Sequence, residues 1–136
     1  MTAYVLDSSA LLRYADYEAG AKRVEAILWE CVSGRARGYI SAVQWGEVAG
    51  RLYQKLETVR AMGVLTSLLP SEVEIVPVTA ERAVRAGIYK VEKKLGYTDS
   101  FAFELANESH DRVLVTADYG FKDVESLIQI EFLPAK

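Results

Sequence analysis

The chain has 136 residues, of which 51% are hydrophobic and 26% are charged, so its length and composition suit one folded domain covering residues 1–136. No apolar stretch approaches the ~18 residues of a membrane span, and no basic segment precedes the first apolar run. The single cysteine, Cys31, cannot form an internal disulfide. These features predict a cytoplasmic protein that does not enter a membrane.

The charge is unevenly distributed. The net charge is −3, which argues against a broadly basic surface that coats nucleic acid. Residues 1–68 hold 8 basic and 7 acidic side chains, whereas residues 69–136 hold 8 basic and 12 acidic ones. A nucleic-acid substrate would therefore need local basic patches, and an acidic pocket would need a cation before a phosphate could approach.

Short apolar runs alternate along the chain with segments whose apolar residues have helical spacing. The runs predict strands at residues 4–6, 39–40, 73–78, 112–116 and 127–133, with the last at a sheet edge because its polar and apolar residues alternate. Helices are predicted from about residue 10, at 18–33, from 42 to about 56, at 58–69, from 80 to 95 and at 99–109. Strands separated by helices imply an α/β fold with a mostly parallel sheet, whose strand order the pattern leaves open.

Several polar residues are expected to cap these helices. Ser8 or Ser9 precedes the first helix, Ser41 and Gln44 match the S-x-x-Q capping box, and Thr98 precedes the last helix. The predicted helix that Thr79 opens carries four apolar residues on one stripe. The stripe consists of Val84, Ile88, Val91 and Leu95.

Four acidic residues lie where a parallel sheet binds ligands, beyond the carboxyl ends of the strands. Asp7 ends the first strand, Asp118 lies two residues past the fourth, Asp99 is in the first turn of a helix, and Glu47 lies within one to two turns of the second strand. Each also has an ordinary explanation. Asp7 could cap a helix, Asp99 could favour the helix dipole, and Asp118 could be a turn residue.

Glu47 points away from the apolar stripe of its helix, so a surface pair with Arg51 is the simplest explanation for it. Gly46 and Gly50 argue against this explanation, because each costs a helix on the order of 1 kcal/mol relative to alanine. We expect something to approach the helix closely beside these two glycines.

The segments VLDSSALL, SAVQWGEVAG, YTDSFAFELA and LVTADYGF, in this order and spacing, resemble PIN-domain ribonucleases and particularly the VapC-type toxins of toxin–antitoxin pairs. The resemblance covers residues 4 to about 122. It implies a three-layer α/β/α sandwich around a mostly parallel five-stranded sheet. It also implies that Asp7, Glu47, Asp99 and Asp118 are catalytic and hold Mg²⁺ or Mn²⁺, with Ser9 and Thr116 as supporting polar residues. Asp123 is the one nearby match for a fifth acid of some relatives, at a different spacing.

The function implied is metal-dependent endoribonuclease activity, with RNA as substrate, a cognate antitoxin as partner and a homodimer as the assembly. Arg13, Arg51 and Lys55 lie on the neighbouring helices and are our candidates for binding RNA. Further candidates are two basic clusters and three aromatic residues that could stack on bases. They are Arg35 with Arg37, Lys90 with Lys93 and Lys94, and Tyr97, Tyr119 and Phe121.

Other functions lack necessary residues. The only histidine is His110, which excludes a two-histidine ribonuclease, and there is no GxxxxGKS loop for a P-loop NTPase. A haloacid-dehalogenase-type phosphatase would need an acid at Ser9, and a receiver-like domain would need paired acids and a late lysine. A PIN-like scaffold that binds RNA or protein without cleavage remains open.

Overall fold

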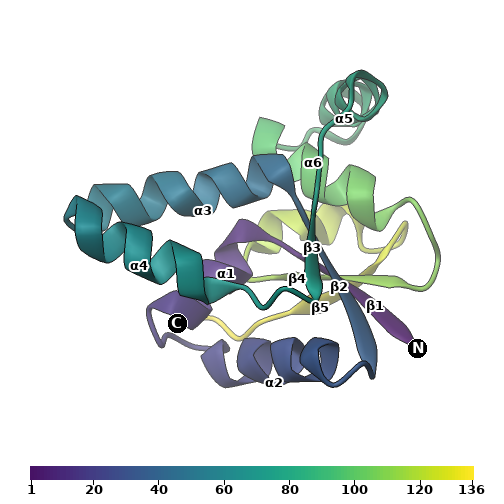
Figure 1. The fold of residues 1–136 in the computed structure, drawn as a ribbon. Coiled ribbons are helices and arrows are strands. Elements are labelled where there is room, and N and C mark those ends of the chain that lie inside the picture. Colours follow the sequence, from purple (N-terminus) through teal and green to yellow (C-terminus); the bar gives the residue numbers. More distant parts are fainter.

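The computed structural model describes residues 1–136, and Figure 1 shows a central sheet with helices on both sides of it. All five strands are parallel, in the order β3-β2-β1-β4-β5. They are β1 (Thr2–Leu6), β2 (Ala36–Ser41), β3 (Val73–Val76), β4 (Arg112–Thr116) and β5 (Gln129–Phe132). The predicted α/β/α sandwich is confirmed, and β5 is an edge strand as expected.

All six predicted helices are present, and a short 3₁₀ helix follows β4. They are α1 (Ser8–Ala15), α2 (Ala21–Val32), α3 (Ala42–Lys55), α4 (Thr58–Leu68), α5 (Ala80–Lys93), α6 (Tyr97–Ala106) and the 3₁₀ helix η1 (Tyr119–Val124). None of the helices combines the length and the apolar character needed to cross a membrane.

Ser41 caps α3 as predicted, since its Oγ accepts a hydrogen bond from the Val43 amide at 3.3 Å. Two other predicted caps are wrong. Ser8 and Ser9 lie inside α1, and Thr98 lies inside the first turn of α6, whose N-cap is Gly96. Hydroxyls that cap no helix are available for other partners, and this matters for the site below.

The strand order places a topological switch at the centre of the sheet. From β1 the chain proceeds outward through β2 to β3, then returns to place β4 on the other side of β1. The carboxyl ends of β1 and β4 therefore border the crevice in which open parallel sheets bind ligands. Asp7 directly follows β1 and Asp118 lies two residues beyond β4.

Both faces of the sheet are buried, as expected for parallel strands covered by helices. Leu6 and Ile40 point to the face covered by α1 to α4, where they join the larger apolar cluster. Val5 and Leu114 point to the opposite face and pack with Phe103 of α6. The cysteine of α2, Cys31, is buried in the larger cluster.

The predicted apolar stripe of α5 lies mostly outside the core. Val84, Ile88 and Val91 are 63%, 50% and 76% exposed, and only Leu95, beyond the helix, is buried. Figure 1 shows why, because α5 stands apart from the sheet and packs on α6. Periodicity indicated an amphipathic helix correctly, but it could not show that α6 alone lies under it.

Ionic contacts join α5 to α6 beside the apolar contact that Ala86 and Tyr89 provide. Glu104 of α6 is only 4% exposed and pairs with Arg82 at 3.0 Å and with Arg85 at 3.2 Å. Arg82 also pairs with Glu108 at 2.6 Å. A buried carboxylate with two arginine partners has its desolvation offset only while both partners remain in place.

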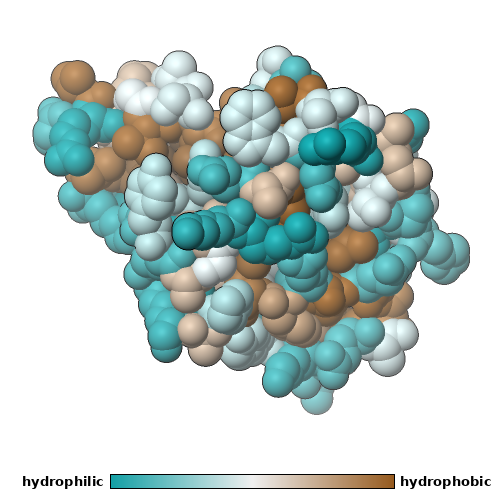
Figure 2. Space-filling model, turned by 90° about the horizontal axis from the view of Figure 1, so that it is seen from below, coloured by the Kyte–Doolittle hydropathy of each residue, from teal (hydrophilic) through white to brown (hydrophobic).

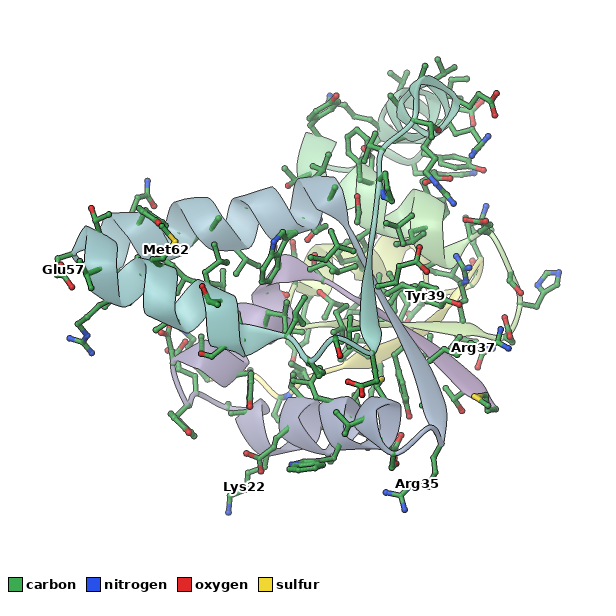
Figure 3. The ribbon with its side chains drawn as sticks, in the orientation of Figure 1. Lys22, Arg35, Arg37, Tyr39, Glu57 and Met62 are labelled. Atoms are coloured by element: carbon green, nitrogen blue, oxygen red, sulfur yellow. The ribbon has the colours of Figure 1, made fainter.

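A second exposed apolar area lies at the tip of the α3–α4 hairpin. Figure 2 shows hydrophobic surface gathered at this end of the molecule, and Figure 3 labels Met62 there. Val59 and Met62 are 77% and 54% exposed. The helical layer therefore leaves apolar surface on two separate helix faces.

We predict that Glu104→Ala lowers the free energy of unfolding by about 2 kcal/mol, because it leaves the mostly buried Arg82 with one carboxylate in place of two. Urea unfolding followed by circular dichroism measures the change. Glu92→Ala, at an exposed position of α5, is the matched control and should change stability by less than about 0.5 kcal/mol. Equal effects of the two substitutions would contradict the role given to Glu104.

Candidate functional site

The four predicted acids come from four different elements and line one cavity of about 380 Å³. Asp7 is at the N-cap position of α1, Asp118 at that of η1, Asp99 in the first turn of α6, and Glu47 in α3. The cavity lies at the carboxyl ends of the two central strands, where the strand order predicts a ligand site. The expectation that these distant carboxylates face a common space agrees with this arrangement.

Asp7 is the most buried of the four, with 2% of its surface exposed. Its Oδ2 accepts hydrogen bonds from Ser9 Oγ at 2.5 Å and from Thr116 Oγ1 at 2.8 Å. Its Oδ1 is buried and has no hydrogen-bond partner. A buried carboxylate oxygen without a partner carries a free-energy cost, and a cation would remove that cost.

The two supporting residues are themselves held in place by the backbone after β4. Ser9 Oγ accepts a hydrogen bond from the Ala117 amide, and Thr116 Oγ1 accepts one from the Asp118 amide, both at 2.9 Å. Ser9 and Thr116 therefore link the end of β1 to the loop that carries Asp118. Asp118 in turn accepts a bond from the Gly120 amide at 2.8 Å, so it is also the turn residue that its sequence suggested.

Glu47 does not make the surface pair with Arg51 that was its simplest explanation. Its carboxylate instead accepts hydrogen bonds from Ser8 Oγ and from Thr98 Oγ1, the second at 3.2 Å. The expectation of a close approach at Gly46 and Gly50 is wrong within this chain, because nothing lies within 4 Å of a Cβ built at either position. The Glu47 side chain leaves α3 toward Ser8 of α1 and Thr98 of α6.

Burial and the charges of the neighbouring acids raise the pKa of two of the four carboxyl groups. Burial, the charges of Asp7 and Asp118 and a hydrogen bond with Asp118 raise the pKa of Asp99 from 3.8 to about 7. Burial also raises the pKa of Asp7 to about 6, although the hydroxyls of Ser9 and Thr116 oppose this shift. Near neutral pH, this cavity therefore holds a proton in the absence of a cation.

The donor set suits a hard divalent cation, which prefers carboxylate oxygens. The free Oδ1 of Asp7 is a further sign of fit, since it is a buried ligand atom without a protein partner. No group of three or more histidine, cysteine, aspartate or glutamate side chains is arranged to hold a metal ion as it stands. The four carboxylates thus share a cavity without forming a closed coordination shell.

The three predicted RNA-binding residues line the same cavity. Arg13 donates to the carbonyls of Ala19 and Pro134 at 2.8 Å, and Lys55 pairs with Asp16 at 2.7 Å. Arg51 has no hydrogen-bond or ion-pair partner, so its charge is available at the edge of the cavity. Lys136, which the sequence analysis did not single out, also lines the cavity and pairs with Glu18 at 2.6 Å.

The remaining candidates lie outside the cavity lining. Tyr97 and Tyr119 are exposed, whereas Phe121 is buried in the core. His110 and Arg112 border a larger cavity of about 610 Å³ beside the start of β4 and β5. That cavity contains no cluster of acids, so its size does not make it the better candidate. The residues outside the lining are Asp123, His110, Tyr97, Tyr119, Phe121, Arg35, Arg37, Lys90, Lys93 and Lys94.

The sequence analysis named Gln44 only as a capping residue and missed its place beside the site, where it is fully buried. Its amide accepts a bond from the Ser8 backbone and donates one to the Thr98 backbone, so it does not form the predicted capping box with Ser41. One signal was available in the sequence. Gln44 lies four residues before Val48 on the buried side of α3, where a polar residue requires partners.

The fold and cavity define an α/β protein with an acidic site at the switch point of a parallel sheet. A model of the PIN domain family matches residues 4–127, and the chain therefore belongs to the PIN-domain family. This membership rules against the phosphatase and the receiver-like alternatives. A search of curated proteins by sequence finds no match.

Solved structures with the same fold include proteins of toxin–antitoxin systems. The chain is similar to VapBC2 from Rickettsia felis, bound to a DNA fragment from its promoter, with a TM-score of 0.74, 18% identity and coverage of 98% of this chain and 100% of that chain. It is also similar to DNA-bound VapBC from Salmonella typhimurium, with a TM-score of 0.70, 19% identity and coverage of 97% of this chain and 98% of that chain. A third similar structure is VapC20 from Mycobacterium tuberculosis, a toxin that cleaves the sarcin–ricin loop. Its TM-score is 0.70, with 15% identity and coverage of 96% of this chain and 99% of that chain.

The raised pKa values predict how stability depends on pH. Between about pH 4 and pH 7 the folded protein holds protons at Asp7 and Asp99 that the unfolded chain has released. This stabilising contribution is therefore complete below pH 4 and is lost as the pH rises through 7. We predict that metal-free Asp99→Asn protein gains stability relative to the wild type between pH 4 and pH 8.

The measurement is the urea midpoint of each protein in EDTA across this pH range. Asp123→Asn, which removes an exposed carboxylate outside the cavity, is the control and should follow the wild-type profile. Parallel profiles for Asp99→Asn and wild type would show that Asp99 titrates normally and is not crowded by other acids.

Proposed function

We propose that this protein is an endoribonuclease dependent on Mg²⁺ or Mn²⁺, and the toxin of a VapBC-type toxin–antitoxin pair. One observation carries the proposal. Asp7, Glu47, Asp99 and Asp118 reach one cavity from four elements, and Asp7 keeps a buried oxygen with no protein partner. Membership of the PIN-domain family and the VapC fold of the structural neighbours support it.

We assign the four acids different roles from their hydrogen bonds and pKa values. Asp7 and Asp99 would hold the principal cation, because Asp7 has a free oxygen and Asp99 carries the strongest raised pKa. Glu47 and Asp118 would complete the shell, directly or through water, since each already accepts hydrogen bonds within the protein. When bound, Mg²⁺ or Mn²⁺ acidifies a water molecule and neutralises charge on a phosphate.

The protein groups supply orientation and proton release. Ser9 and Thr116 hold one oxygen of Asp7, which keeps the other directed away from its hydroxyl partners. Asp99 must lose its proton before it can act as a ligand, so cation binding should tighten as the pH rises toward 7. We expect hydrolysis of an RNA phosphodiester that leaves a 5′-phosphate and a 3′-hydroxyl.

RNA would reach the acids across the basic edge formed by Arg13, Arg51 and Lys55. A chain with a net charge of −3 does not attract RNA over its whole surface, so RNA binding requires a local basic patch. Arg51 contributes most, because it alone of the three has no partner within the protein. Arg13 and Lys55 would also shape the edge through their contacts with Pro134 and Asp16.

We also propose an antitoxin partner and a homodimer. VapBC complexes among the structural neighbours support the antitoxin. An apolar groove of about 240 Å³ between α2 and the end of α4, with Trp29 63% exposed, supports a protein partner on that face. The exposed stripe on α5 offers a second apolar face, suited to another copy of the chain.

The direct test is incubation of the purified protein with total RNA in Mg²⁺, in Mn²⁺ or in EDTA, with the product ends mapped. We expect cleavage with either cation and none in EDTA. Asp7→Asn should reduce the rate by about 100-fold or more, because it removes the charge of the ligand with the free oxygen. Asp123→Asn should cleave at the wild-type rate.

Two results would contradict the proposal: cleavage that persists in EDTA, or full activity in folded Asp7→Asn protein. RNA binding without cleavage under every metal condition would instead support the non-cleaving scaffold. Mass action supplies a further readout, because millimolar Mn²⁺ should raise the melting temperature of the wild type and not of Asp7→Asn.

A second prediction concerns RNA binding. Arg51→Ala should weaken binding of a short RNA and reduce the slope of log K against log salt concentration by about 1, because one phosphate contact is lost. Fluorescence anisotropy at several salt concentrations measures both quantities. Arg35→Ala is the matched control, since Arg35 precedes β2 at the opposite end of the sheet, as Figure 3 shows. Equal slopes for the two variants would exclude Arg51 from the RNA path.

A further inference from the structure

The buried amide of Gln44 joins the two elements that carry Asp7 and Asp99. Gln44 Oε1 accepts a hydrogen bond from the Ser8 backbone N–H, and Nε2 donates one to the Thr98 backbone carbonyl, both at 2.6 Å. Ser8 directly follows Asp7, and Thr98 directly precedes Asp99. A single side chain of α3 therefore spans from α1 to α6 next to both carboxylates.

Glu47, one turn further along α3, binds the same two residues through their side chains. Its carboxylate accepts hydrogen bonds from Ser8 Oγ and Thr98 Oγ1. Ser8 and Thr98 are thus each held twice, by Gln44 at the backbone and by Glu47 at the hydroxyl. Gln44 and Glu47 are three residues apart on one helix, so they lie on the same side of α3 and reach the same two partners.

The hydrogen bonds of Gln44 oppose the electrostatic repulsion between the carboxylates of the cavity. Carboxylates that share a cavity repel one another when no cation is present, and repulsion favours separation of the elements that carry them. A neutral amide can hold both elements without adding charge to the cavity. Gln44 is fully buried, so its bonds are not weakened by competition with solvent.

We propose that Gln44 is a positioning residue that fixes the separation of Asp7 and Asp99 so that both can bind one divalent cation. This inference rests on the proposed function, because it assumes that these two carboxylates share the cation. It adds that their affinity for the cation depends on a side chain that does not itself touch the ion. Residues that support metal ligands from outside the shell typically change affinity by about 10-fold to 100-fold.

The test compares Gln44→Met, which keeps the length of the side chain and removes both hydrogen bonds, with Gln54→Met, at an exposed position of the same helix. Isothermal titration with Mn²⁺ measures binding without any reaction. We expect Mn²⁺ to bind Gln44→Met about tenfold more weakly than wild type, and Gln54→Met as tightly as wild type. Cleavage by Gln44→Met should recover at high Mn²⁺, because the ligands themselves are intact.

The outcomes separate this inference from the proposed function. Wild-type protein that binds no Mn²⁺ and cleaves no RNA would overturn the proposed function, and this inference with it. Wild-type affinity in folded Gln44→Met would overturn the positioning role alone. If Gln44→Met does not fold, Gln44→Asn keeps a neutral amide but is one methylene too short to reach both the Ser8 amide and the Thr98 carbonyl. It should also bind Mn²⁺ more weakly, and wild-type affinity there would equally refute the role.

Discussion

Asp7 places a carboxylate at the end of the central strand, where it is almost completely removed from water. Desolvation of a carboxylate is costly, and two hydroxyls, from Ser9 and Thr116, offset that cost for one of its oxygens. The other oxygen has no protein partner. None of the other three acids can supply the missing hydrogen-bond donor or positive charge, since each adds a carboxylate to the same cavity.

Hydrogen bonds between the surrounding elements keep the four carboxylates in one cavity although these carboxylates repel one another. Ser9 and Thr116 connect the end of β1 to the loop after β4, and Gln44 and Glu47 connect α1 to α6 through α3. The contacts of Ser9, Thr116 and Gln44 are made by neutral groups, which add no charge to the cavity. A cation that entered the cavity would therefore meet carboxylates carried by elements that are tied to one another by hydrogen bonds.

Predictions from the sequence succeeded where the signal was local. Apolar runs identified the five strands, helical spacing identified the six helices, and the position of each acid relative to a strand end indicated the cavity. They failed where the outcome depended on a neighbour. Thr98 and Ser8 looked like helix caps, yet their hydroxyls bind Glu47. Periodicity also left open what covers the apolar stripe of α5, most of which is exposed.

By itself the sequence determined the class of fold and the elements, and it indicated four acids near strand ends as candidates for one site, because periodicity and strand ends are local properties of the chain. Only the tertiary structure decided the strand order, which sets β1 beside β4 and so brings Asp7 near Asp118. It also decided that Gln44 spans between α1 and α6, and that Arg51 is free while Lys55 is paired. Those results depend on distances between residues far apart in the chain, and packing of the helices on the sheet sets those distances.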